Sequence, residues 1–299
     1  MRVGVGAAGH HHGEILQGVL RCEGEWVPCL ITMPLEGVGS RARYVAATST
    51  QSLDVVPAWK KKAARAAGLA LAAIGAPAAG RLDIECSVAT GVGLGSSTCD
   101  VVAAIRAVCS AHGVELDSGK VARLAIEAEG AADPIMFDGE MVLFAQRHGR
   151  VLESFGSWVP RYAVLSIDTD LGVRGIDTLS LPMPRYTDAD VAAFERMIGR
   201  ARQAFQQRDP VTLAAIATES ATLNQRFLPM RKFREVQDLA VEYQALGVQI
   251  SHSGTVAGIV FDGQRLQSVA GLAEELTVRV RSLGVRPRGL FMTGAPIID

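Results

Sequence analysis

The sequence has few aromatic residues, few cysteines and almost no net charge. Phe, Trp and Tyr make up 5% of the 299 residues, so the 48% that are hydrophobic are largely Ala, Val and Leu. The 30 Lys and Arg residues nearly balance the 31 Asp and Glu residues, for a formal net charge of −1. A charge this small argues against nucleic acid or an anionic membrane as a partner, since no overall field would hold their phosphates.

Cysteine usage and the N-terminus both point to a cytoplasmic protein. The five cysteines, at positions 22, 29, 86, 99 and 109, form no C-x-x-C pair and leave one thiol over, which argues against a disulfide framework. No apolar signal-peptide core follows Met1. The Ala-rich stretch 63–79 is broken by glycine and proline and lacks the large apolar side chains of a membrane span. One basic cluster, Lys60-Lys61-Lys62 with Arg65, is expected on the solvated face of a helix.

The length suggests two domains at roughly 100–200 residues each, or one large domain. In the first, polar and apolar residues alternate over 43–48 and 81–88, which predicts strands. Apolar residues at helical spacing predict one helix from near Ser96 to His112, and another from an N-cap at Asp117 or Ser118 to about Glu129.

A turn-rich segment through Gly149, Gly156 and Pro160 marks the expected boundary, with domains 1–157 and 158–299. The second domain is expected to open with a strand over 162–168 and to be rich in helix from about 188 to 245. Further strands are expected over 248–251, 256–261 and 289–293, with a helix near 265–283. This order of elements favours an α+β sandwich.

Two glycine-rich segments compete as phosphate sites. The first, Gly4-Val5-Gly6-Ala7-Ala8-Gly9, fits the dinucleotide pattern but has no full strand before it and no apolar helix after it, so a glycine-rich strand or turn is expected. The second, Gly91-Val92-Gly93-Leu94-Gly95-Ser96-Ser97-Thr98, lies between a strand and a helix. Glycine backbone amides, a helix N-terminus and three hydroxyls suit phosphate, although a glycine turn with serine N-caps is the alternative.

The second segment carries a family resemblance. Gly93-Leu94-Gly95-Ser96-Ser97-Thr98 resembles the ATP loop of the GHMP kinases, with Ala89 where that family usually has proline. Ser251–Gly258 and Gly13–Gly18 resemble two further motifs of the family. The sequence G-E-I-L-Q-G of the latter and the H-S-G-T-V-A-G turn resemble the L-threonine kinases of cobalamin biosynthesis and propanediol utilisation.

The resemblance implies a two-domain α+β GHMP kinase fold. Its N-terminal α/β domain would resemble ribosomal protein S5 domain 2, and its C-terminal domain a ferredoxin-like α+β sandwich. It also implies ATP and Mg²⁺ as cofactors. The partners are then ATP and a small hydroxylated substrate such as an amino acid, and a homodimer is left open.

Phosphoryl transfer needs Mg²⁺ and a group that orients the attacking hydroxyl. Ser97 and one carboxylate suffice for the metal. Glu127 shares a polar stripe with Arg123, whereas Glu129 lies nearer the apolar stripe, so Glu129 is the expected ligand, with a buried or capping role as the alternative.

Asp133 precedes Pro134, which favours an extended conformation. By resemblance it occupies the position of the family's catalytic aspartate and would act as general base. The alternative is an ordinary Asp-Pro turn.

Acceptor contacts are expected from the N-terminal motif and the C-terminal turn. In an extended segment at most His10 and His12 of the histidine run share a face, and no cluster completes a zinc site. His12 is instead expected to line the acceptor pocket with Glu14, which suits an ammonium group, and Gln17. A surface or packing role for the histidines is the alternative. From the turn we expect His252, Ser253 and Gly254, whose amides suit a carboxylate or phosphate.

The sequence therefore predicts transfer of the ATP γ-phosphoryl group to the hydroxyl of L-threonine. The catalytic and metal-binding residues of this prediction are Asp133, Ser97 and Glu129. One alternative is a kinase for homoserine, serine or an intermediate of specialised metabolism. Others are a non-catalytic ATP-binding regulator and, third, a dehydrogenase.

Overall fold

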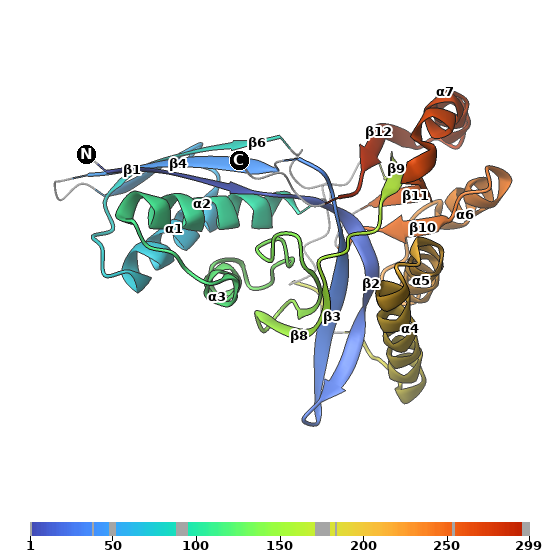
Figure 1. Cartoon of the computed structure of the whole chain (residues 1–299), viewed down its shortest axis with the longest axis horizontal. Coiled ribbons are helices and arrows are strands. Elements are labelled where there is room, and N and C mark those ends of the chain that lie inside the picture. The colour runs from blue at the N-terminus through green and yellow to red at the C-terminus, as the bar shows by residue number, and fades with distance from the viewer. Residues whose placement is uncertain are drawn as a thin grey trace.

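The computed structural model describes residues 2–37, 39–47, 52–87, 95–170, 180–182, 184–252 and 255–294. These residues form three four-stranded sheets with α-helices packed against them (Figure 1). Gly91, Gly93 and Leu94 of the predicted phosphate loop, and Ser253 and Gly254 of the C-terminal turn, lie outside the described residues. None of the helices in the described ranges is long and apolar enough to cross a membrane.

The first sheet has the order β1-β4-β6-β5. Its strands are β1 (Val3–Ala8), β4 (Ser40–Ala46), β5 (Leu53–Val56) and β6 (Gly80–Cys86), and helices α1 (Lys61–Ala73) and α2 (Ser96–His112) pack against it. The alternating segments predicted as strands correspond to β4 and β6, which pair antiparallel. The Gly4–Gly9 segment runs as strand rather than as a dinucleotide loop. A Cβ on Gly4 or Gly6 would lie 2.2–2.3 Å from backbone atoms of α2, so glycine lets the helix approach the strand.

Local capping signals define α2 and α3 (Ser118–Glu129) as the sequence predicts. Gly113 adopts a left-handed conformation that ends α2. The Asp117 side chain accepts a hydrogen bond from the Lys120 backbone and starts α3. The two helices bring the N-terminus of α2 next to the C-terminal end of α3, where Ser97 contacts Glu129.

A long hairpin links the two halves of the molecule. The strands β2 (His11–Cys22) and β3 (Glu25–Pro34) form the second sheet with β7 (Met141–Ala145) and β8 (Arg150–Gly156), in the order β2-β3-β7-β8. In Figure 1 the hairpin runs between the N-terminal helices and α4 (Asp188–Gln207) and α5 (Pro210–Asn224). The prediction of a turn-rich segment through residues 149–160 is wrong in part. Residues 150–156 form a strand that pairs with β7, and a glycine turn lies at each end of it.

The third sheet is antiparallel, with the order β10-β11-β9-β12. Its strands are β9 (Tyr162–Asp168), β10 (Gly247–Ile250), β11 (Val256–Asp262) and β12 (Arg286–Met292). With α4, α5, α6 (Phe233–Glu242), the short 3₁₀ helix η1 (Gly263–Arg265) and α7 (Leu266–Ser282), it confirms the predicted α+β arrangement. The boundary after residue 157 stays a prediction. Buried side chains of β2, such as Ile15 and Val19, share a core with Phe194 of α4 across it.

Candidate active site

The N-terminus of α2 gathers hydroxyl and carboxylate groups. Ser97 Oγ donates a hydrogen bond to Glu129 Oε2 at 2.6 Å, and Thr98 Oγ1 donates one to Glu129 Oε1 at 2.8 Å. Glu129 is buried whereas Glu127 is exposed, as the helical spacing predicts. Gly95, the residue before the helix, has a φ of 73°, a left-handed conformation that favours glycine. Both carboxylate oxygens of Glu129 thus face the start of α2.

The donor set fits Mg²⁺. Burial raises the pKa of Glu129 to about 7 despite the two hydroxyl donors and Lys62 Nζ, which lies 3.9 Å from Oε2. A cation beside this buried carboxylate would hold it in its ionised form. Mg²⁺ takes one or two oxygen ligands from protein and the rest from phosphate and water, so Ser97 and Glu129 are sufficient.

Asp133 lies beside the same helix end. Its carboxylate Oδ2 is 3.5 Å from Thr98 Oγ1, and its backbone N–H donates to that oxygen at 3.4 Å. Thr98 therefore contacts both Glu129 and Asp133. The two carboxylates named by the sequence analysis, from the end of α3 and the loop after it, come together at the first turn of α2.

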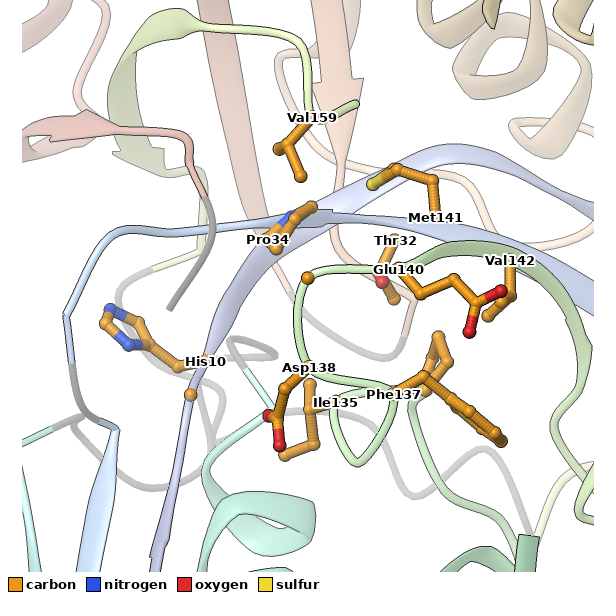
Figure 2. A pocket seen from close by; sticks show the side chains of 13 residues that line it. His10, Thr32, Pro34, Ile135, Phe137, Asp138, Glu140, Met141, Val142 and Val159 are labelled. Atoms are coloured by element: carbon orange, nitrogen blue, oxygen red, sulfur yellow. The ribbon is translucent and has the colours of Figure 1, made fainter. Parts of the chain in front are cut away.

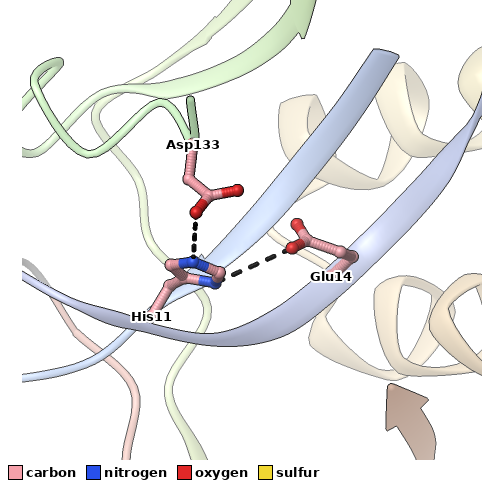
Figure 3. Close-up of side chains that lie close together, drawn as sticks. All are labelled: His11, Glu14 and Asp133. Atoms are coloured by element: carbon pink, nitrogen blue, oxygen red, sulfur yellow. Dashed lines mark ion pairs between the residues drawn. The ribbon is translucent and has the colours of Figure 1, made fainter. Parts of the chain in front are cut away.

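A histidine that the sequence analysis did not select contacts Asp133. His11 Nε2 lies 3.0 Å from Asp133 Oδ2, and His11 Nδ1 lies 3.7 Å from Glu14 Oε1 (Figure 3). One ligand atom from each of the three residues lies within 4.8 Å of the others. The sequence analysis assumed simple alternation along the strand and therefore grouped His12 with Glu14, whereas the structure groups His11 with Glu14. The one available signal was the histidine run just before the G-E motif.

Two irregularities in β2 explain this cluster. His11 pairs with Pro34, Glu14 with Thr32 and Gln17 with Leu30, so three residues of β2 repeatedly oppose two of β3. Gly13, with a φ of 62°, lies in the first irregularity. Because paired residues share a face of a sheet, His11, Glu14 and Gln17 lie on one face despite their odd spacing.

The charges in the cluster follow from burial and proximity. Burial disfavours the imidazolium of His11, but the charges of Asp133 and Glu14 outweigh it and raise the pKa of His11 to about 9. Burial alone would raise the pKa of Asp133, but the His11 cation lowers it below its usual value. Burial raises the pKa of Glu14 well above its usual value, and neither Glu14 oxygen has a hydrogen-bond partner among the described residues. His11 and Asp133 therefore form a charged pair in this cluster, and burial of Glu14 favours its neutral form.

Gln17 and His252 meet although they lie far apart in the sequence. Gln17 Oε1 is 2.9 Å from His252 Nδ1, and Gln146 Nε2 is 3.1 Å from His252 Nε2. These partners assign the Nδ1–H tautomer, which donates to Gln17 and accepts from Gln146. Burial also lowers the pKa of His252, which favours this neutral form.

His12 is not brought to this group of residues. Its ring is completely buried, is hydrogen-bonded to Gln249 and lies 5.7 Å from the ring of Phe291, measured between centroids. The geometry gives His12 a packing role between β2 and the third sheet. Its assignment to the acceptor pocket stays a prediction that no contact in the described residues supports.

Lys60 corrects the expectation of a solvated basic face. Lys61, Lys62 and Arg65 are exposed, but Lys60 is buried, with its Nζ 2.6 Å from Asp100 Oδ1. Ser40 Oγ donates to the same carboxylate oxygen at 2.7 Å. Lys60 precedes the first turn of α1, so it faces inward toward α2 while the residues after it follow the helix surface.

Two cavities flank this region. One of about 200 Å³ is lined by Trp59, Ser96, Ser97 and the lysines at 60–62. A small one of about 30 Å³ lies between β3 and the loop after Asp133, with His10 and Asp138 at its edge (Figure 2). The first cavity includes Ser96 and Ser97 of the predicted phosphate loop, and its exposed Lys61 and Lys62 suit an anionic ligand, whereas Lys60 is paired with Asp100 in its lining.

Two family descriptions match this chain. The descriptions "GHMP kinases N terminal domain" and "GHMP kinases C terminal" match residues 61–138 and 201–275. The chain belongs to the GHMP kinases. A homoserine kinase from Cytophaga hutchinsonii, 14% identical, has the same fold, with a TM-score of 0.70 over 99% of this chain and 95% of that chain. The predicted GHMP kinase fold is confirmed.

Two curated relatives are L-threonine kinases. That of Citrobacter freundii is 29% identical to this GHMP kinase over 188 residues, 62% of this chain and 63% of the relative. That of Salmonella typhimurium is 28% identical over 187 residues, 62% of this chain and 61% of the relative. The match thus covers less than two thirds of the length of either relative.

Proposed function

We propose that this GHMP kinase transfers the γ-phosphoryl group of ATP to the side-chain hydroxyl of L-threonine, giving O-phospho-L-threonine and ADP. The observation that carries the proposal is the convergence of Ser97, Glu129 and Asp133 at the N-terminus of α2. The similarity to L-threonine kinases supports the choice of acceptor.

The N-terminus of α2 is the donor side. The backbone N–H groups of a first helical turn and the helix dipole favour negative charge there, and Ser96, Ser97 and Thr98 add hydroxyls. The adjoining cavity offers lysines for phosphates and the 61% exposed side chain of Trp59 for a base. Mg²⁺ held by Ser97 and Glu129 would neutralise charge on the phosphate oxygens.

Asp133 lies on the acceptor side and is ionised beside His11. It accepts a hydrogen bond from the substrate hydroxyl and so orients the oxygen toward phosphorus. The bond from this oxygen to the γ-phosphorus forms as the bond to the bridging oxygen of ADP breaks, and the hydroxyl proton passes to Asp133. Glu14 is buried and has no hydrogen-bond partner in the part of the chain that the structure describes; it binds the ammonium group, whose charge favours the ionised carboxylate.

The test is ADP release by the purified protein with Mg²⁺ and ATP, using L-threonine, L-serine and L-homoserine. Asp133→Asn is expected to lower kcat by about 10²–10⁴-fold. Glu129→Gln is expected to raise the Mg²⁺ concentration needed for half-maximal rate, whereas the matched control Glu127→Gln, at an exposed position two residues earlier, leaves it unchanged. Turnover with L-serine or L-homoserine but not with L-threonine would change the proposed acceptor. ATP binding without turnover of any of the three would favour a non-catalytic regulator.

A further inference from the structure

Gln17, Gln146 and His252 form one wall of a large cavity. The cavity has a volume of about 610 Å³ and extends to the segment before α4 and the end of α5. Among the residues that the structure describes, no Asp or Glu lines it. The cavity therefore admits a small ligand with a negatively charged group beside this wall.

The imidazole ring of His252 connects the two amides of this wall. Its Nδ1–H donates to Gln17 Oε1, and its Nε2 accepts from Gln146 Nε2. Burial lowers the pKa of His252, which favours the neutral ring, and a neutral ring has one donor and one acceptor. The tautomer that suits one glutamine therefore fixes the orientation of the other. Through His252, Gln146 determines which atom of the Gln17 amide is turned away from the ring.

The wall presents two unpaired atoms of opposite polarity. Gln17 Nε2 and Gln146 Oε1 are buried and have no hydrogen-bond partner within the described ranges of the chain. Both residues are only 4% exposed, and an unpaired polar group at this depth is unfavourable. A ligand in the cavity that accepts a hydrogen bond from Gln17 Nε2 removes this cost.

The backbone holds both amides in place. Ser220 Oγ of α5 accepts a hydrogen bond from the Gln17 N–H at 3.0 Å and donates one to the Gln17 carbonyl oxygen at 3.3 Å. The carbonyl oxygen of Gln146 accepts from the Ala132 N–H at 3.0 Å, next to Asp133. The wall is thus connected by hydrogen bonds to the loop that carries the candidate base.

The order of residues along β2 decides which group of the acceptor reaches Gln17. His11, Glu14 and Gln17 pair with alternate residues of β3, so they follow one another on one face with Glu14 in the middle. In the proposed function the hydroxyl meets Asp133, beside His11, and the ammonium group meets Glu14. The carboxylate of L-threonine is the group that remains for Gln17, the next residue on this face.

We propose that Gln17 Nε2 donates a hydrogen bond to the α-carboxylate of L-threonine, and that Gln146, acting through His252, is the positioning residue that keeps this donor turned toward the cavity. The inference rests on the proposed function, because it assigns the polar group of the acceptor that Asp133 and Glu14 leave without a partner. A carboxamide oxygen can accept the same hydrogen bond but carries no charge, so it binds more weakly. The wall therefore selects the acid over its amide.

The first test compares KM for L-threonine and L-threoninamide in the ADP-release assay, at a slightly acidic pH where both amino groups are protonated. For the intact enzyme, KM for the amide is expected to be about tenfold higher. Gln17→Met, which removes the donor, is expected to raise KM for L-threonine about 10–100-fold and to bring the ratio of the two KM values close to one. The kcat with either acceptor changes little.

The second test addresses Gln146. In Gln146→Met the ring of His252 is no longer held in one tautomer, so Gln17 can turn either atom toward the cavity, and the ratio of the two KM values is expected to fall toward one. A purely structural role would raise both KM values in proportion and leave their ratio unchanged. Gln206→Met is the matched control, since it makes the same substitution at an exposed position of α4.

A third measurement needs no change at either glutamine. ¹⁵N NMR spectra identify the tautomer of His252, whose signals are assigned by their loss in His252→Asn. Protonated Nδ1 and unprotonated Nε2 are expected, and the reverse overturns the inference. Phosphorylation of L-threonine with the same KM as the amide also overturns it and leaves the proposed function standing. ATP binding without ADP release for either acceptor overturns both.

Discussion

His11 Nε2 lies 3.0 Å from Asp133 Oδ2, so a strand near the N-terminus supplies a positive charge to the carboxylate that follows α3. His11 contacts the candidate base rather than the candidate metal ligands, so we propose that it positions the base. Its ring also packs against Gly95 at the start of α2.

Replacing His11 by Asn is expected to lower kcat more than it changes KM for ATP. The variant loses the cation that keeps Asp133 ionised, so the pKa of Asp133 rises toward the value set by burial. The acidic limb of the kcat–pH profile should therefore move to higher pH, and His11→Lys should restore it in part. A purely structural role would lower activity at all pH values and leave the shape of the profile unchanged.

The same pair makes stability depend on pH in the alkaline range. The pKa of His11 is raised from 6.5 to about 9, so its contribution to the free energy of unfolding is complete below about pH 6.5 and is lost as pH rises through about 9. Asp133 and Glu14 are the acidic groups that face it, and His10, His12 and His252 also interact electrostatically with it. The difference in melting temperature between the intact protein and His11→Asn should shrink over that interval. A constant difference would contradict the prediction.

Replacing Glu14 by Gln is expected to raise KM for the acceptor and to leave KM for ATP unchanged. Gln is the same size as Glu but cannot carry the negative charge that binds an ammonium group. The loss of a charged hydrogen bond costs about 1.5–3 kcal/mol, which corresponds to an increase in KM of about 10–100-fold. An acceptor without an amino group should be unaffected. An unchanged KM for L-threonine would remove Glu14 from the site.

Replacing Gly95 by Ala is expected to impair both folding and catalysis. The φ of 73° costs an alanine about 1–2 kcal/mol, and its Cβ would lie 2.4 Å from His11 Cδ2. Gly113→Ala is the matched control, because its φ is 66° but no atom lies within 4 Å of the added Cβ. Denaturant unfolding should show a larger loss for Gly95→Ala, and only this variant should lower kcat.

Replacing Lys60 by Met is expected to destabilise the protein by about 3–5 kcal/mol, because it leaves the buried carboxylate of Asp100 without its cation. Lys61→Met, at an exposed neighbouring position, should change the free energy of unfolding by less than about 0.5 kcal/mol. Urea titration of both variants measures the difference. Equal effects would mean that Lys60 contributes no more than a surface lysine.

The sequence predicted the parts of the fold that depend on local signals. The ends of α2 and α3 follow from Gly113 and Asp117, and the inward direction of Glu129 follows from helical periodicity. The β2–β3 hairpin escaped prediction because neighbouring residues such as Ile15 and Leu16 are both buried, which removes the alternation of a half-exposed strand.

In the candidate site, too, the sequence predicted the residues that belong to local motifs and missed those that depend on tertiary structure. Ser97, Glu129 and Asp133 belong to motifs whose contacts can be inferred from the sequence, and Gln17 does meet His252. The role of His11 could not be inferred, since it depends on a strand irregularity at Gly13 that changes which side chains share a face. Lys60 and Asp100 pair across tertiary structure, which no local pattern encodes.

The two irregularities in β2 give residues 11–17 a repeat of three residues instead of two. Backbone pairing with β3 therefore fixes the spacing of His11, Glu14 and Gln17 along one face of the strand. A shift of the β2–β3 register by one residue would move all three side chains to the other face together.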